Sequence, residues 1–331
     1  MTTILDVPKD INPKVTNLSS DQDRNYAAVL NHVQRIEKLP VSSRKSAETA
    51  TLTEMERMWL TRDCLLRFLR ATKWHVNDAV KRIEKTLVWR RGYGVEKLTP
   101  EHVSPESETG KQYILGFDLA GRPCLYLRPA RQNTPVSPRQ IQHLVYMLER
   151  CIDLMPQGVE TLALVTDFSS SSHSSNPSAS TGKQVLNILQ THYPERLGRA
   201  MVINIPFFVW AFFKLIGPFI DPVTREKLKF NENLRELIRP DQLDKDFGGD
   251  VEFEYVHDIY WPALTTMAAE RREQMLENWR AAGSQIGTSE SAMKETSFHN
   301  NDPVENGVLE NEVGEKAETS QMQVANPPLS A

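Results

Sequence analysis

A strongly apolar segment between Pro206 and Ile220 limits what this chain can be more than any other feature does. Its 15 residues, PFFVWAFFKLIGPFI, include Lys214, Gly217 and Pro218, and charged clusters flank it on both sides. A transmembrane helix needs about 20 apolar residues in a row. The segment is therefore too short and too interrupted to span a bilayer. A buried core helix and a helix that covers a hydrophobic ligand both remain open.

The composition excludes several other classes of protein. Charged residues make up 25% of the chain and the net charge is −4, without a polybasic block, which argues against nucleic acid as a partner. The three cysteines are isolated and show no CxxC or Cys/His spacing, so neither a disulfide framework nor a metal site is expected. This pattern suits a cytoplasmic protein without a cofactor, and the N-terminus does not resemble a signal peptide.

Changes in the hydrophobic pattern divide the chain into five parts. Residues 1–50 read as a flexible extension with a short helix around 25–39, and 51–97 as a small helical domain. Residues 98–253 read as a mixed domain and 254–283 as a C-terminal helix. Residues 284–331 carry eight acids and two lysines, and we expect this tail to be disordered.

The middle part has the pattern of an α/β domain. The runs KQYILGFD and PCLYLRP flank LAGR, a plausible hairpin turn, and an amphipathic helical pattern follows at 139–155. The apolar runs at 161–168 and 200–205 show little alternation, as expected for strands covered on both faces, and a helical pattern lies between them. Strands that alternate with helices predict a largely parallel sheet.

The motifs of common enzyme classes are absent from the sequence. No GxGxxG follows a strand, so a dinucleotide site is unsupported. The run SSSSHSSN at 169–176 combines serines with a histidine, but no GxSxG elbow exists to hold a nucleophile. We therefore expect a protein that is not an enzyme.

Five stretches, in order, resemble the CRAL-TRIO lipid-binding family. They are LLRFLRATKW, GRPCLYL, THYPERLG, NIPFFVWAFFKLIGPFIDPVTREK and DFGGD, and the resemblance covers about residues 50–280. It is greatest to the fungal secretory-pathway phosphatidylinositol transfer proteins, and within them to the pleiotropic-drug-resistance branch. The resemblance implies a sheet floor and a helical gate that enclose one lipid, preceded by a small helical domain.

The same resemblance implies which residues hold the lipid. The inositol headgroup would contact Glu195 of YPER and Lys227 of the DPVTREK segment, with weaker roles for Asp221 and Thr224. The alternative without a lipid is that Glu195 and Lys227 form a structural ion pair or are two exposed charges. The gate would present Phe207, Phe208, Trp210, Phe212, Phe213, Ile216 and Phe219.

The basic residues of the first stretch have two possible roles. Arg67, Arg70 and Lys73 either face a lipid phosphate near the pocket or form a solvated face of a helix.

Departures from the family pattern concern the choice of lipid. Phosphatidylcholine-binding members use hydrogen-bonding side chains where this chain has Ile114, Leu125, Leu162 and Leu164. Because a buried phosphate without partners is costly, we expect little phosphatidylcholine binding. These apolar side chains would suit a sterol, although they are also ordinary core residues.

The resemblance as a whole implies a protein that binds phosphatidylinositol and transfers it between membranes. It further implies peripheral contact with a membrane surface of the endoplasmic reticulum, cell periphery or lipid droplets, and presentation of the lipid to a lipid kinase. A sterol carrier and a membrane-sensing scaffold are the alternatives.

Overall fold

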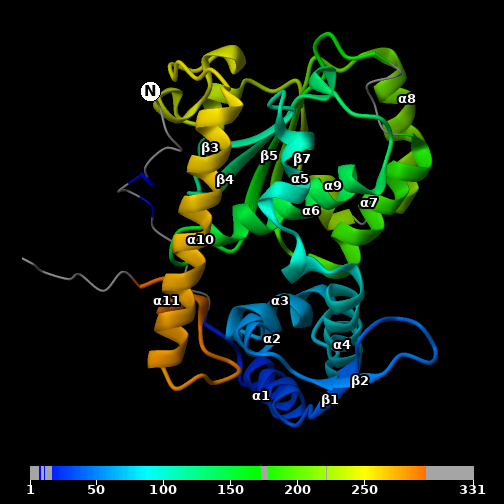
Figure 1. Ribbon diagram of the computed structural model, residues 1–331, viewed down its shortest axis with the longest axis vertical. Helices are drawn as coiled ribbons and strands as arrows, with labels where there is room; N and C mark the ends of the chain where they lie inside the picture. Colours follow the sequence, from blue (N-terminus) through cyan, green and yellow to red (C-terminus); the bar gives the residue numbers. More distant parts are fainter. Residues whose placement is uncertain (1–6, 9–10, 12–16, 173–177, 221, 296–331) are drawn as a thin grey trace, which may run out of the picture. The chain divides into compact units, whose positions relative to one another are not determined.

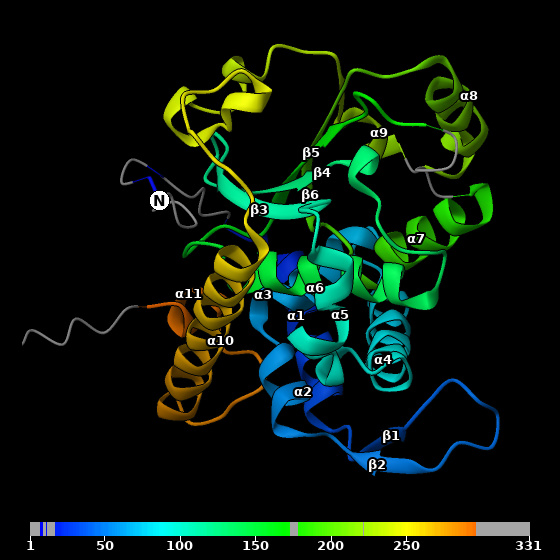
Figure 2. The ribbon, with the colours of Figure 1, turned by 45° about the horizontal axis from the view of Figure 1, so that its top comes forward.

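The computed structural model describes residues 7–8, 11, 17–172, 178–220 and 222–295, and its centre is a five-stranded sheet (Figures 1 and 2). The strand order is β3-β4-β5-β6-β7. The first pair is antiparallel and the other three neighbouring pairs are parallel, which confirms the predicted α/β class. The strands are β3 (Gln112–Phe117), β4 (Pro123–Leu127), β5 (Leu162–Asp167), β6 (Leu197–Ile203) and β7 (Leu228–Phe230).

One row of residues crosses this sheet at a single level. Ile114 pairs with Leu125, Leu125 with Leu164, Leu164 with Ala200, and Ala200 with Leu228. Register partners project to the same face of a sheet, as do residues two apart in one strand. The predicted apolar positions on β3, β4 and β5 therefore share one face.

Helices surround this sheet and connect its strands. The long amphipathic pattern predicted at 139–155 forms α6, which begins with a proline in its first turn and packs against β3, β4, α5 and α10. The helices of this part are α5 (Pro100–Ser107), α6 (Pro138–Asp153), α7 (Ala179–His192), α8 (Phe207–Ile216), α9 (Pro222–Glu226) and α10 (His257–Ala281). Short 3-10 turns lie at Val95–Lys97, Pro129–Arg131, Gly217–Phe219, Leu234–Glu236, Pro240–Gln242 and Lys245–Phe247.

The N-terminal part is more ordered than the sequence predicts. Its first helix begins at residue 20 rather than 25, after a capping box between Ser19 and Gln22, and it buries Val29 and Val33 completely. Residues 20–51 are thus not a flexible extension. The elements here are α1 (Ser20–Gln34), β1 (Lys38–Pro40), β2 (Thr49–Thr51), α2 (Glu54–Trp59), α3 (Arg62–Ala71) and α4 (Val76–Tyr93).

The described chain also continues beyond the expected start of the disordered tail. After α10, the segment 284–295, which we call the C-terminal strap, contains α11 (Glu290–Met293). Ile286 packs into the cluster of the N-terminal helices, and Met293 packs with Trp279. The acidic composition of the whole tail concealed these two apolar anchors. Residues 296–331 of the predicted tail lie outside the described residues.

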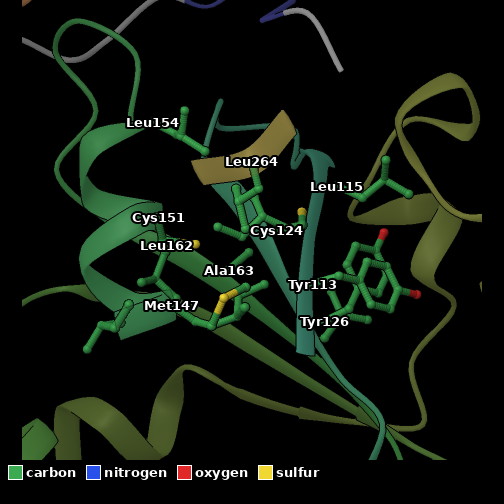
Figure 3. Packing of buried hydrophobic residues seen from close by; sticks show 14 of the residues in the cluster. Tyr113, Leu115, Cys124, Tyr126, Met147, Cys151, Leu154, Leu162, Ala163 and Leu264 are labelled. Atoms are coloured by element: carbon green, nitrogen blue, oxygen red, sulfur yellow. The ribbon is translucent and has the colours of Figure 1, made fainter. Parts of the chain in front are cut away.

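The two strands of the β3–β4 hairpin contribute a stacked pair of tyrosines to the core (Figure 3). Tyr113 and Tyr126, register partners on β3 and β4, have ring centroids 4.8 Å apart. The Tyr113 hydroxyl donates to Asp244 Oδ2 at 2.7 Å. A buried hydroxyl needs such a partner, so this bond ties β3 to the segment that follows the sheet. The three cysteines, Cys64, Cys124 and Cys151, are free and buried.

The end of α7 is attached to α4. The Arg82 guanidinium donates to the carbonyl oxygens of Gln190 and Thr191, the latter at 3.0 Å. The His192 ring stacks on Trp89 with centroids 4.1 Å apart. A basic side chain on the last carbonyls is favourable at a helix C-terminus. The chain therefore enters the turn before β6 from a fixed point.

We expect stability to fall on acidification below about pH 6.5 because His192 is buried uncharged. Burial, with Lys85, Arg82 and Arg90 nearby, lowers the pKa of His192 to about 4. The unfolded chain binds a proton near its ordinary pKa of about 6.5, so this contribution is complete above that pH and is lost as the pH falls toward 4. The free energy of unfolding, measured with urea at pH 7.5, 6 and 5, should fall more steeply with decreasing pH in the wild type than in His192→Phe. The two slopes should differ by up to about 1 kcal/mol per pH unit. Equal slopes would contradict this prediction.

Candidate functional site

Glu195 lies in the turn between α7 and β6. Its backbone has φ +58°, a left-handed conformation that is unfavourable for a residue with a Cβ. Both sides of the turn are anchored: the Tyr193 hydroxyl donates to Glu149 Oε1 at 2.6 Å, and Arg196 Nη1 donates to the carbonyl of Glu160 at 2.9 Å. The Glu195 side chain is half-buried and has no hydrogen-bond or ion-pair partner among the described residues.

Lys227 lies at the start of the neighbouring strand, β7. It follows α9 and directly precedes β7, and its carbonyl accepts from the Ala200 N–H at 2.9 Å. Its side chain is half-buried and, like that of Glu195, is unpaired within the described part of the chain. In the parallel register of β6 and β7, Ala200 pairs with Leu228, so Lys227 lies beside the first half of β6, while Glu195 precedes that strand. The described residues contain no Glu195–Lys227 ion pair, so the structure does not support that alternative.

The two weaker headgroup candidates are less well defined. Thr224 lies in α9, is half-buried, and accepts from the Lys227 N–H through its carbonyl at 3.2 Å. Asp221 lies outside the described residues.

The apolar segment that limits the fold forms α8, whose two sides differ. Trp210 and Phe213 contact Phe230 of β7, with ring centroids 5.0 and 5.3 Å apart. Phe207, one turn before Trp210, is 87% exposed, Trp210 itself is 36% exposed, and Leu215 on the far side of the helix is 60% exposed. Phe208 is half-buried, and the side chains of Phe212, Ile216 and Phe219 lie outside what the structure describes. The helix thus covers the end of the sheet and also presents large apolar groups to the surroundings.

The predicted apolar wall is tightly packed. Ile114, Leu125 and Leu162 are at most 1% exposed and belong to the main core cluster, while Leu164 is half-buried against it. Their role against a lipid stays a prediction, because core packing alone would give the same burial.

A hollow that the sequence did not predict lies where β6 and β7 end and α8 begins. Its volume is about 590 Å³, and it is lined by Ile203, Asn204, Ile205, Asn231, Glu232, Leu234 and Phe247. Asn204 and Asn231 both have φ +53°, and the Asn231 side chain accepts from the Asn204 N–H at 3.0 Å. Asparagine is one of the few residues that tolerates this conformation. An asparagine directly after each of two strands was the signal that could have pointed here.

Two basic residues that were candidates for a lipid phosphate have other partners. Arg67, only 3% exposed, donates to Glu160 Oε2 at 3.0 Å and to Glu290, and Arg70 donates to Glu160 at 2.8 Å. Arg67 therefore neither lies on a solvated helix face nor is free to bind a phosphate. The sequence missed this because Glu290 is 223 residues away.

The described ranges show neither a metal centre nor a membrane-spanning helix. No group of three or more His, Cys, Asp or Glu side chains there could hold a metal ion. The described helices include none that is both long and apolar enough to cross a membrane.

Comparison with known proteins places this geometry in context. The CRAL/TRIO domain model matches residues 107–249, and the CRAL/TRIO N-terminal domain model matches residues 25–85. These ranges overlap the expected domains at 98–253 and 51–97, but the N-terminal match begins earlier than expected. A CRAL-TRIO domain-containing protein of Schizosaccharomyces pombe is 60% identical over 282 residues, which cover 85% of this chain and 28% of that protein.

A second relative matches along most of both chains. The phosphatidylinositol transfer protein PDR17 of Saccharomyces cerevisiae is 41% identical over 296 residues, which cover 84% of this chain and 85% of that protein. Among solved structures, that of Sfh5 aligns with 78% of this chain and 100% of its own, at 16% identity and a TM-score of 0.48.

Proposed function

Because this chain belongs to the CRAL-TRIO family, we propose that it binds one phosphatidylinositol molecule and transfers it between membranes. One observation carries the proposal. Glu195 and Lys227, of opposite charge and both half-buried, lie unpaired among the described residues, each shortly before one of the neighbouring parallel strands β6 and β7. A charge that is partly withdrawn from water gains from an opposite charge or a hydrogen-bond partner, which a bound ligand can supply. The relative that matches along most of its length is named as a phosphatidylinositol transfer protein.

The chemistry of the two side chains fits an inositol phosphate. A carboxylate accepts hydrogen bonds from inositol hydroxyls, and an ammonium group donates to phosphate or hydroxyl oxygens. In this proposal Glu195 and Lys227 select the headgroup, and Thr224 and Asp221 assist.

The acyl chains supply affinity without selecting the lipid. Burying two chains of ordinary length is worth on the order of 20–25 kcal/mol at about 0.8 kcal/mol per CH₂ group. A bilayer offers nearly the same gain, so exchange is close to neutral and the headgroup contacts decide which lipid is held. The proposal assigns the covering role to α8, which bears large apolar groups on both of its sides.

The proposal includes weak binding of phosphatidylcholine. None of Ile114, Leu125, Leu162 and Leu164 can donate a hydrogen bond to a phosphate. The same apolar row on one face of the sheet favours a sterol as the second candidate ligand.

Lipid analysis and a transfer assay test the proposal. Lipids that copurify with the full chain are identified by mass spectrometry, and transfer of labelled phosphatidylinositol, phosphatidylcholine and sterol between vesicles is then measured. We expect bound phosphatidylinositol and its selective transfer. Equal transfer of phosphatidylcholine would overturn the selectivity, sterol alone would favour the second candidate, and binding without transfer would indicate a membrane-sensing scaffold. A lipid-kinase assay with wild type and Lys227→Ala tests presentation of the lipid.

The exposed side of α8 gives a prediction about membrane contact. Leu215→Asp should weaken binding to vesicles about tenfold, because it removes an apolar group worth roughly 1.5–3 kcal/mol when buried. Leu119→Asp is a matched control: this leucine lies in the β3–β4 turn and is also 60% exposed. Cosedimentation with vesicles measures both variants. An equal loss in the two would show that α8 has no special role in docking.

A further inference from the structure

A buried cluster of charges joins the C-terminal strap to the turn that carries Glu195. Glu290 of the strap accepts from Arg67 of α3 and, at 3.2 Å, from Nη2 of Arg196. Arg196 is 8% exposed, and the Glu290 side chain is 13% exposed. Three segments far apart in the sequence therefore meet at one carboxylate, which neither the fold nor the headgroup chemistry so far explains.

Arg196 is adjacent to the residue whose backbone is strained. A left-handed conformation at a residue with a Cβ is unfavourable and persists only where the surroundings enforce it. On the C-terminal side of Glu195, the contacts of Arg196 hold the backbone. The Arg196 side chain donates to the Glu160 carbonyl and to Glu290, and the Arg196 carbonyl accepts from the Leu162 N–H at 2.9 Å. Glu290 supplies the charged partner in this set.

Electrostatics favour a role for Glu290 in the position of Arg196. Burial lowers the pKa of Arg196, and the neighbouring Arg67 guanidinium lowers it further, so the two cations repel each other. Glu290 lies between them and bonds to both. Without that carboxylate, the repulsion would drive Arg196 toward solvent and release the strained turn.

Contacts from other segments hold the strap, and with it Glu290, in place. The Glu290 N–H donates to Asp63 Oδ2 at 2.6 Å, and the Thr61 hydroxyl donates to the Glu290 carboxylate at 3.2 Å. The Asn278 side chain donates to the Met293 carbonyl at 2.9 Å. Contacts from α3, α10 and the residue before α3 thus fix the carboxylate independently of Arg196.

We propose that Glu290 is a positioning residue of the headgroup site: through Arg196 it holds Glu195 in the conformation that meets the inositol ring. The C-terminal strap is then part of the machinery that selects phosphatidylinositol. This inference rests on the function proposed above.

Coupling between two positions distinguishes positioning from general stability. We expect Glu290→Ala to lower the rate of phosphatidylinositol transfer about tenfold, within the usual range for coupled sites. Glu290→Gln keeps an oxygen acceptor and should retain more of the rate than alanine does. If Glu290 acts through Glu195, then Glu195→Gln combined with Glu290→Ala should be no slower than Glu195→Gln alone. Losses that multiply in the double variant would overturn the proposal.

A matched control and a second variant complete the test. Glu54→Ala removes an ion pair between α2 and Arg280 of α10 that is about half exposed, and it should transfer phosphatidylinositol like the wild type. Arg196→Lys keeps the charge but cannot reach both acceptors, so a several-fold loss is expected even if Glu290→Ala does not fold. Wild-type rates in folded Glu290→Ala, or in Arg196→Lys, would refute the positioning role. No phosphatidylinositol transfer by the wild type would instead refute the proposed function itself.

Discussion

Replacing Lys227 by alanine is expected to lower the rate of phosphatidylinositol transfer roughly ten- to hundredfold, because a hydrogen bond to a charged group is worth about 1.5–3 kcal/mol. The Lys227 side chain makes no bond to another described residue, so its loss should leave the midpoint of urea unfolding unchanged. A vesicle transfer assay and an unfolding curve on the same preparation measure the two effects.

The control for this variant is a lysine with an exposed partner. Lys245 pairs with Glu252 on the surface, where both side chains are more than 60% exposed. Lys245→Ala should therefore change neither transfer nor stability. If Lys227→Ala transferred phosphatidylinositol at the wild-type rate, the assignment of Lys227 to the headgroup site would be wrong, whatever lipid the protein carries.

Replacing Glu149 by alanine is expected to have the largest effect on stability, about 3–5 kcal/mol. Arg90 donates to both oxygens of Glu149, at 2.7 and 3.0 Å, and the Tyr193 hydroxyl donates at 2.6 Å. Burial raises the pKa of Glu149, but the charge of Arg90 and these hydrogen bonds outweigh burial and bring it to about 2. Alanine would leave a guanidinium and a hydroxyl in the core without this partner.

A graded series separates the charge from the hydroxyl. Tyr193→Phe removes one hydrogen bond and leaves the Arg90–Glu149 pair intact, so about 1 kcal/mol is expected. Urea unfolding gives both values at pH 7. A loss for Glu149→Ala no larger than that for Tyr193→Phe would mean that Arg90 finds another partner, and Glu96, which it already contacts at 2.6 Å, would be the candidate.

Much of the central domain follows from local pattern. The amphipathic run at 139–155 and the apolar runs at 161–168 and 200–205 gave α6, β5 and β6, because each is long enough to show a period. The start of one strand was displaced by three residues: β6 begins at Leu197, before the apolar run, because Leu197 and Arg199 pair with Leu162 and Ala163 of β5 across a register shift.

Short elements held by distant residues could not be predicted. The hairpin of β1 and β2 has two strands of three residues and no alternating pattern. Its carbonyls at Leu39, Ala50 and Thr51 accept from Arg91, about 40 to 50 residues away in the sequence. β7 was missed for the same reason, since three residues beside β6 carry no period of their own.

The candidate site was also predicted only in part from the sequence. Motifs drew attention to Glu195 and Lys227, but only the structure shows that their side chains are unpaired in the described residues and that they precede two neighbouring parallel strands. The sequence placed Glu290 in a polar tail, because composition averages over a segment and cannot identify one buried carboxylate. The partners of that carboxylate are 94 and 223 residues away, beyond any local pattern.

That separation also bears on how the protein is made. Translation proceeds at about 5–20 residues per second, so roughly 10–45 s pass between the synthesis of Arg67 and that of Glu290. During this interval the N-terminal helices lack one carboxylate for a buried guanidinium, and Ile286 has not yet covered their apolar cluster. The first part of the chain to leave the ribosome is thus among the last to complete its packing. A nascent chain that stalls before residue 286 would present an unfinished apolar surface to the chaperones of the cell.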